Sequence, residues 1–192
     1  MKVVAFVGSA RKNGNTLALV KHVFAELEAA GIECEAIELA GKRVHGCTAC
    51  MKCAETKDGS CPGVRDFVSE TCIPKALEAD GIIIASPTYF ADVTSETKAL
   101  IDRLGYASRQ GGGHLARKVG AGVVAVRRAG AIHALDTINH LFLYGEMVMI
   151  GSTYWNVGIG RAPGEVENDE EGVRTMHNLG KNMAWLLERV RG

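Results

Sequence analysis

The chain alternates short, almost wholly apolar runs with longer segments in which apolar residues recur at steps of three and four. The first pattern is typical of buried strands and the second of amphipathic helices. In segment 16–30, Leu17, Val20, Phe24 and Leu27 form one stripe, which predicts a helix that covers one face of a sheet. The predicted strands are 2–7, 33–39, 81–86, 119–126 and 147–150, and the predicted helices are 16–30, 67–79, 95–106, 131–145 and 172–191.

Strands that alternate with helices along a chain favour a parallel sheet. The run Gly-Ile-Ile-Ile-Ala at 81–85 is apolar on both sides, as expected of a strand buried beneath helices on two faces. We therefore predict the α/β class, with a doubly wound parallel sheet in a single domain over residues 1–192. Segments 40–65 and 153–168 resist this pattern, and long connections of this kind are usually functional or mobile.

The balance of charged residues limits the kinds of partner that the protein can bind. The 22 Lys and Arg residues match the 22 Asp and Glu residues, so no net field would attract nucleic acid or an anionic membrane surface. The start of the chain lacks the regions of a secretory signal, and no apolar run approaches the roughly 20 residues of a membrane-spanning helix. We expect a cytoplasmic protein that binds neither nucleic acid nor membrane.

The loop after the first predicted strand has the composition of an anion site. Segment 8–16 reads Gly-Ser-Ala-Arg-Lys-Asn-Gly-Asn-Thr and leads directly into the first predicted helix, whose first N–H groups have no partner within the helix. It matches neither the dinucleotide fingerprint nor the nucleoside-triphosphate loop, which leaves a mononucleotide phosphate. The alternative is a plain strand-to-helix turn in which Asn15 or Thr16 caps the helix.

A second loop, Pro87-Thr88-Tyr89-Phe90, follows segment 81–86, and in an open parallel sheet such loops share the edge where ligands bind. Both loops resemble those of the flavodoxin-like, NAD(P)H-dependent FMN reductase superfamily, through G-S-A-R-K-N-G-N-T at 8–16 and S-P-T-Y-F at 86–90. The resemblance covers nearly the whole chain and implies FMN on a five-stranded sheet of order 2-1-3-4-5. It implies phosphate contacts from Ser9, Arg11, Asn13, Asn15 and Thr16, ring contacts from Pro87, Thr88, Tyr89 and Phe90, and a third flavin loop at Arg128, Ala129 and Gly130.

Four of the six cysteines fall within fifteen positions, as Cys47-x2-Cys50-x2-Cys53-x7-Cys61. Four thiolates at such steps can converge on one [4Fe–4S] cubane, each binding one iron. The spacing resembles the motif of the iron–sulfur flavoproteins, which implies that these four cysteines hold such a cluster close to FMN. Structural zinc and a set of redox-active thiols are the alternatives. No function is assigned to Cys34 or Cys72, because free cysteine commonly behaves as a small buried hydrophobic residue.

The leading hypothesis is a flavin-dependent oxidoreductase in which a one-electron donor such as ferredoxin reduces the cluster, and FMN passes electrons to a small acceptor such as dioxygen, peroxide or a quinone. No catalytic side chain is assigned. The rival enzyme is an NAD(P)H-dependent FMN or quinone reductase without a cluster, and a rival of another class is a non-catalytic redox sensor. We expect a homo-oligomer, a dimer or tetramer, because a cluster in a long loop would otherwise be exposed.

Overall fold

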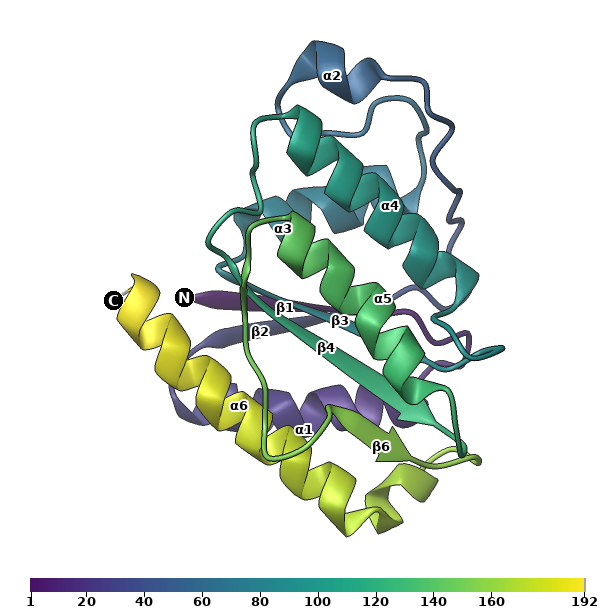
Figure 1. The fold of residues 1–192 in the computed structure, drawn as a ribbon, viewed down its shortest axis with the longest axis vertical. Helices are drawn as coiled ribbons and strands as arrows, with labels where there is room; N and C mark the ends of the chain where they lie inside the picture. Colours follow the sequence, from purple (N-terminus) through teal and green to yellow (C-terminus); the bar gives the residue numbers. More distant parts are fainter. Residues whose placement is uncertain (192) are drawn as a thin grey trace.

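The computed structural model describes residues 1–191 and has a parallel sheet at its centre (Figure 1). The strand order is β2-β1-β3-β4-β5, and a further short strand, β6, also pairs with β4. All of these pairings are parallel, which confirms the predicted flavodoxin-like architecture. The strands are β1 (Lys2–Val7), β2 (Glu33–Glu38), β3 (Gly81–Pro87), β4 (Val119–Val126), β5 (Val148–Met149) and β6 (Val157–Ile159).

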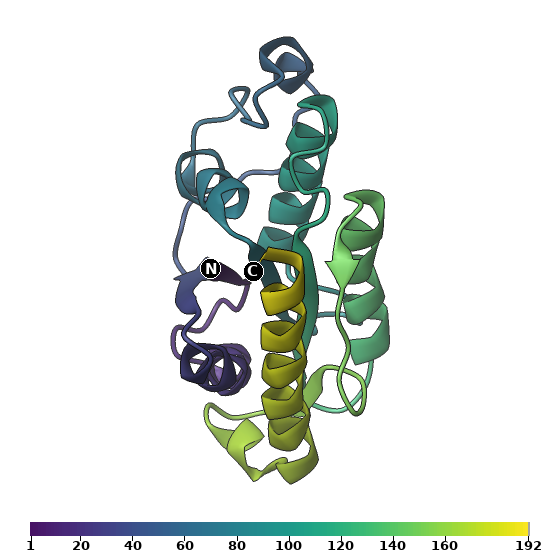
Figure 2. The ribbon, with the colours of Figure 1, turned by 90° about the vertical axis from the view of Figure 1, so that its left-hand side faces the viewer.

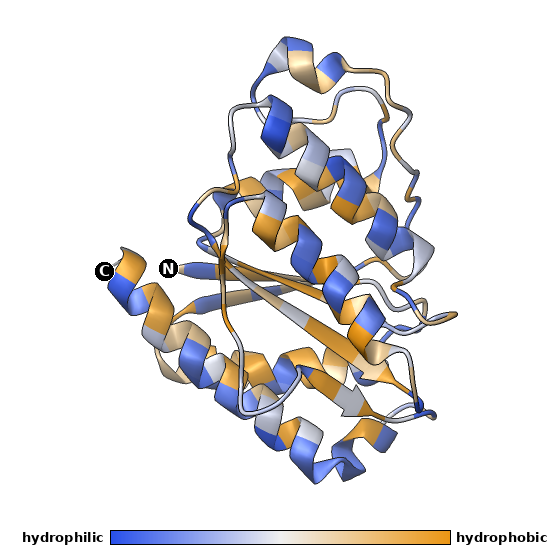
Figure 3. Cartoon of the chain, in the orientation of Figure 1, coloured by the Kyte–Doolittle hydropathy of each residue, from blue (hydrophilic) through white to orange (hydrophobic). Residues whose placement is uncertain are grey.

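Helices cover both faces of the sheet, as Figure 2 shows from the side. One face lies against α1 (Asn15–Ala29) and α6 (Glu170–Arg191), and the other against α3 (Ile73–Glu78), α4 (Ser95–Gln110) and α5 (Ala131–Tyr144). Along β1, Val4 and Phe6 join the second of these cores, whereas Val3, Ala5 and Val7 join the first. The strand is therefore apolar on both sides because each side faces helices, and the sheet is correspondingly hydrophobic in Figure 3.

Several elements differ from the pattern predicted from the sequence. Segment 67–79 is a π-helical turn, η1 (Val68–Cys72), that runs into the short α3, where Pro74 has no N–H to donate to a preceding turn. The five-residue α2 (Lys52–Thr56) lies inside the cysteine segment. Both elements are too short for apolar periodicity to reveal them.

The fifth position of the sheet is broken into two pieces. A strand does lie within the predicted segment 147–150, but this strand, β5, holds only two residues. After seven residues outside the sheet, β6 pairs with β4 farther along the same edge. β6 and the 3₁₀ turn η2 (Glu165–Asn168) both lie in segment 153–168, which resists the alternating pattern of the sequence. Among residues 1–191, no helix has both the length and the apolar character needed to cross a membrane.

Candidate functional site

A cavity of about 250 Å³ opens at the carboxyl edge of the sheet, where the strand order reverses between β1 and β3. This edge is where ligands bind in open α/β sheets. The structure brings together there most of the residues predicted for the first two loops. The lining residues are Ser9, Arg11, Gly14, Asn15 and Thr16 after β1, Pro87, Thr88 and Tyr89 after β3, Ala125 and Arg127 at the end of β4, and Gly160, Arg161 and Pro163 after β6.

The first loop leaves the start of α1 free for an anion. Gly14 is the N-cap and supplies no side-chain cap, and the first turn of α1 contains no acidic residue. The predicted alternative, a cap from Asn15 or Thr16, is therefore wrong. Unpaired N–H groups and the positive end of the helix dipole face the cavity. Gly8 is needed beneath this loop, because a Cβ there would lie 1.7 Å from Thr97 Oγ1 on α4.

A fourth wall of the cavity, segment 160–164, comes from far along the sequence. Arg11 Nη1 donates to the Arg161 carbonyl at 3.1 Å, and Asn15 Nδ2 donates to the Ala162 carbonyl at 2.9 Å. Gly164 N–H in turn donates to Asn15 Oδ1 at 2.8 Å, so the Asn15 amide holds this wall in place. Arg161 of this wall, Arg11 of the first loop and Arg127 give the cavity three guanidinium groups, a strongly anion-attracting set.

The second loop makes a tight turn at the rim of the cavity. Tyr89 N–H donates to the Asp92 carbonyl at 2.8 Å and Asp92 N–H donates back at 3.1 Å, while Phe90 and Ala91 both have positive φ, at 46° and 65°. Positive φ at both central positions is costly without glycine, and such strain collects at ligand-binding sites. Phe90 is fully exposed at the tip of this turn. Thr88 Oγ1 is buried and has no hydrogen-bond partner among the described residues.

Asp92 fixes this turn to α5. Its Oδ1 accepts from Thr137 Oγ1 at 2.7 Å and from Val93 N–H at 2.7 Å. Burial acts to raise the pKa of Asp92, but these two hydrogen bonds outweigh it, so the pKa lies below its usual range. The carboxylate is therefore ionised near neutral pH and keeps both hydrogen bonds.

Five of the predicted flavin-site residues do not line the cavity: Asn13, Phe90, Arg128, Ala129 and Gly130. Asn13 N–H donates instead to Glu38 Oε1 at 3.0 Å. In the third loop the lining residue is Arg127 and not Arg128, although both arginines are exposed. Gly130 supports the turn at Phe90, because its φ is 88° and a Cβ there would lie 2.8 Å from Ala91 Cα.

The four clustered cysteines all line one small hollow of about 20 Å³ between their loop and α4. Cys47 and Cys50 are exposed, and Cys53 and Cys61 are half-buried. The backbone N–H of Lys52 lowers the pKa of the Cys50 thiol, whereas burial raises that of Cys53. Cys34 and Cys72 lie outside the hollow, and burial raises the pKa of each to about 12, which leaves both as unreactive thiols.

The donor set fits a cluster better than a single metal ion. A four-thiolate zinc site needs sulfurs about 3.8 Å apart, given a Zn–S length of about 2.3 Å, and the described residues contain no group of three or more His, Cys, Asp or Glu arranged to hold one ion. A cubane separates its thiolates more widely, since each binds a different corner. The present hollow is small, about 20 Å³, and two of its cysteines, Cys47 and Cys50, are exposed.

Arg103 on α4 anchors this loop from below and is itself only 1% exposed. Its Nη1 donates to both carboxylate oxygens of Asp66 at 2.7 Å, its Nη2 to the Val64 carbonyl at 2.9 Å, and its Nε to Cys61 Sγ at 3.3 Å. Burial acts to raise the pKa of Asp66, but hydrogen bonds from Arg103 and from the Ser69 and His45 N–H groups lower it more. The sequence offered no signal for this pair, because an arginine inside an amphipathic helix normally faces solvent.

The two sites are separated along α4. The helix begins beside the flavin-type cavity, at Ser95, and the cysteine hollow is lined by Arg103 and Tyr106, which lie about 12 to 17 Å farther along the axis at 1.5 Å per residue. Figure 1 shows the α2 region at one end of α4 and the carboxyl ends of the strands near the other. The cysteine hollow and the flavin-type cavity therefore share no lining residue within one protomer.

Comparison with known proteins identifies the family of the chain. Residues 1–162 match the NADPH-dependent FMN reductase family. An iron–sulfur flavoprotein of Methanocaldococcus jannaschii is 37% identical over 200 residues and covers all of both chains. One of Archaeoglobus fulgidus is 33% identical and covers 98% of this chain and 81% of its own. Among solved structures, a flavodoxin from the domain Archaea superposes with a TM-score of 0.63 at 14% identity, over 98% of this chain and 99% of its own.

Proposed function

The chain belongs to the NADPH-dependent FMN reductase family, and from that premise we propose that it is an electron-transferring iron–sulfur flavoprotein with FMN and one [4Fe–4S] cluster. A one-electron donor such as ferredoxin supplies electrons, and a small acceptor such as dioxygen, peroxide or a quinone receives them. The observation that carries the proposal is that Cys47, Cys50, Cys53 and Cys61 line one hollow together with the buried Arg103.

The FMN phosphate fits the first loop. Arg11, Arg127 and Arg161 surround a cavity that the uncapped start of α1 also faces, and a phosphate dianion would compensate all of these donors. Tyr89 and the exposed Phe90 supply aromatic surface for the ring system.

The cluster supplies one-electron chemistry when bound, and the chain's residues set its surroundings. Four thiolates bring excess negative charge to the loop, and the Arg103 guanidinium, which donates to Cys61 Sγ, offsets part of it. Gly63 gives Cys50 the space it occupies, because a Cβ at Gly63 would lie 2.2 Å from Cys50 Sγ. Any side chain at position 63 would displace one of the proposed ligands.

Homo-oligomerisation, as a dimer or tetramer, is part of the proposal. Within one protomer the cysteine hollow and the flavin cavity lie at different positions along α4, and Cys47 and Cys50 are exposed. A second protomer that placed its flavin edge against this loop would shield both cysteines and shorten the electron path. Light scattering of the cofactor-loaded protein should give a mass of two or four chains, and a monomer would contradict this part.

Anaerobic purification tests the cofactor assignment. We expect about four iron and four sulfide per FMN, the composition of one four-cysteine cubane, without zinc. Cys61→Ser should lose iron and sulfide but retain FMN, whereas the matched Cys34→Ser should retain all three, because Cys34 lies outside the hollow. Stoichiometric FMN without iron in the parent protein would contradict the cluster, and zinc in place of iron would make the loop structural.

A second candidate, the NAD(P)H-dependent FMN or quinone reductase, is favoured by the family match over residues 1–162. The two candidates differ in the donor that reduces the flavin. Rapid flavin bleaching by NADPH in Cys61→Ser would support the reductase, since that variant lacks a proposed cluster ligand. Reduction only by a one-electron donor, and only with the cluster present, would support the leading proposal.

A further inference from the structure

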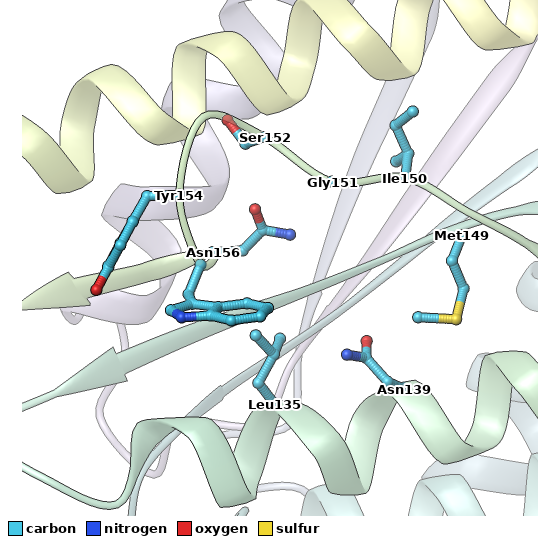
Figure 4. Close-up of a pocket in the computed structure, with 9 residues that line it drawn as sticks. Leu135, Asn139, Met149, Ile150, Gly151, Ser152, Tyr154 and Asn156 are labelled. Atoms are coloured by element: carbon cyan, nitrogen blue, oxygen red, sulfur yellow. The ribbon is translucent and has the colours of Figure 1, made fainter.

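One wall of the flavin-type cavity lies outside the sheet and is exposed on its outer side. We call the exposed part of this wall, residues 161–165, the strap. The strap follows β6, and Arg161 and Pro163 of the strap line the cavity. A larger hollow, of about 450 Å³, lies between α5 and segment 150–156, but no charged side chain lines it (Figure 4). The strap, by contrast, brings a guanidinium group to a proposed phosphate site.

The two ends of the strap are fixed to the rest of the fold. Immediately before it, Gly160 N–H donates to the Val126 carbonyl of β4 at 2.9 Å. Immediately after it, Val166 is fully buried in the core between the sheet and the helices α1 and α6. All five residues of the strap itself are exposed, so none of them packs into that core. The position of the strap therefore depends on polar contacts.

Asn15, the first residue of α1, holds the middle of the strap through both polar atoms of its amide. Its Nδ2 donates to the Ala162 carbonyl at 2.9 Å, and its Oδ1 accepts from Gly164 N–H at 2.8 Å. A flipped amide would set donor against donor and acceptor against acceptor, so the two partners also fix its orientation. Asn15 is only 9% exposed, and water therefore competes weakly for these bonds.

Glu165 closes the strap on itself. Its Oε2 accepts from Ala162 N–H at 2.8 Å and from Arg161 N–H at 2.6 Å. These hydrogen bonds lower the pKa of Glu165 below its usual range, so the carboxylate is ionised near neutral pH and the bonds are charge-assisted. Glu165 does not line the cavity. Its hydrogen bonds hold the strap, whereas its negative charge opposes an anion nearby.

We propose that the strap retains the FMN phosphate, and that Asn15 is a positioning residue that fastens the strap rather than a phosphate ligand. This inference rests on the proposed occupation of the cavity by FMN. The fastened strap keeps the Arg161 guanidinium at the cavity, where it compensates the phosphate charge together with Arg11 and Arg127. When the bonds of Asn15 break, Arg161 leaves this set and FMN dissociates faster. A fastened strap therefore suits FMN that stays bound through many turnovers.

The sign of the Glu165 effect separates the strap from simple electrostatics. Removing a negative charge near an anion site favours the anion, so by charge alone the loss of this carboxylate should slow FMN release. The same loss removes two hydrogen bonds from the strap, which should speed release. Solvent screens an exposed charge, whereas charge-assisted hydrogen bonds act at contact distance. We therefore expect the loss of Glu165 to speed release.

The rate at which FMN dissociates from the loaded protein tests the proposal, followed by the fluorescence of free FMN after dilution. Asn15→Leu, which is similar in size, should release FMN about tenfold faster than the parent, and Glu165→Leu should release it about fivefold faster. Glu167→Leu is the matched control. It removes the same charge two residues farther on, but Glu167 Oε2 accepts from His22 Nε2 on α1 and does not bond the strap. This control should release FMN no faster than the parent.

Two further measurements show whether the bonds of the strap act as one unit. The double variant Asn15→Leu/Glu165→Leu should release FMN no more than about twofold faster than Asn15→Leu alone, because either change already loosens the strap. Hydrogen exchange of Gly164 N–H should quicken in Glu165→Leu, although its own acceptor, Asn15 Oδ1, is intact there. Circular dichroism should match the parent in every variant.

Two outcomes would overturn the strap alone. The first is an unchanged rate of FMN release in folded Asn15→Leu. The second is faster release in Asn15→Leu with slower release in Glu165→Leu, which would make Asn15 a phosphate ligand. In both cases the bound FMN would still support the proposed function. A parent protein that binds no FMN would contradict the proposed function itself, and the strap with it.

Discussion

The flavin-type edge and the cysteine loop are held in place by different means. At the edge, loops leave the ends of buried strands, and Gly8 lies so close to Thr97 that its backbone is fixed from both sides. The cysteine loop runs over α4, and the Arg103–Asp66 pair, with the bonds that Arg103 makes to neighbouring residues, anchors it. The position of the cavity thus depends on the sheet, whereas the position of the cysteine loop depends on one buried side chain of α4.

The largest effect should come from Arg103→Met, which breaks the anchor. Removing one partner of a buried ion pair leaves an uncompensated charge on Asp66 and costs about 3 to 5 kcal/mol of unfolding free energy. Urea denaturation should show this loss, and iron content should fall. Arg109→Met is the matched control on the same helix, because its pair with Glu146 is exposed. Equal stability of the two variants would show that the pair does not anchor the loop.

The double variant Arg103→Met/Asp66→Leu separates stability from cluster binding. Replacing a whole buried pair by apolar groups is often close to neutral, so most of the lost stability should return. The bond from Arg103 Nε to Cys61 would still be absent, and iron content should stay low. Recovery of iron together with stability would mean that Arg103 acts on the cysteines only through the fold.

Gly8→Ala should have the next largest effect on stability. The effect should be confined to the flavin-type cavity at the carboxyl edge of the sheet. A Cβ at Gly8 would lie 1.7 Å from Thr97 Oγ1, and such overpacking costs about 1 to 3 kcal/mol. FMN content should drop while iron content is retained. Gly46→Ala is the control in the cysteine loop, where a Cβ would meet nothing within 4 Å and no change is expected. A larger loss of FMN in Gly46→Ala than in Gly8→Ala would contradict this prediction.

The anchor should weaken in acid. The pKa of Asp66 is lowered in the folded protein, so its contribution is present above the unfolded value of about 3.9 and is lost as pH falls through the folded pKa. The stability difference between the parent and Asp66→Asn should therefore shrink below about pH 4. Glu55→Gln, an exposed change in the same loop, should show little difference at any pH. A constant Asp66 difference down to pH 2.5 would contradict the assignment.

Phe90→Ala should have the smallest effect on stability and a measurable one on FMN. The ring is fully exposed, so unfolding free energy should change by less than about 0.5 kcal/mol. Loss of its aromatic surface should weaken FMN binding severalfold in fluorescence titration, by removing a stacking contact of about 0.5 to 1.5 kcal/mol. Tyr144→Ala, another exposed aromatic away from the cavity, should leave FMN affinity unchanged.

The sequence by itself determined the class of fold and the residues proposed for both sites. Apolar runs such as 81–85 specify strands buried on two faces, and their alternation with amphipathic helices specifies a parallel sheet. The spacing of the four cysteines and the glycine loop at 8–16 are local patterns, so they can be read without the fold. Ser9, Arg11 and Thr16 of the glycine loop, and Thr88 of the loop after β3, were predicted in this way and line the cavity.

Only the tertiary structure decided what depends on contacts between distant residues. The wall at 160–163 reaches Asn15 across about 150 positions of sequence, and Arg103 reaches Asp66 across 37. The gap between β5 and β6 arises because strands of two and three residues pair with β4, and such short strands leave no periodic pattern. Local order follows from local sequence, whereas cavities and buried ion pairs form only where separate elements of the fold meet.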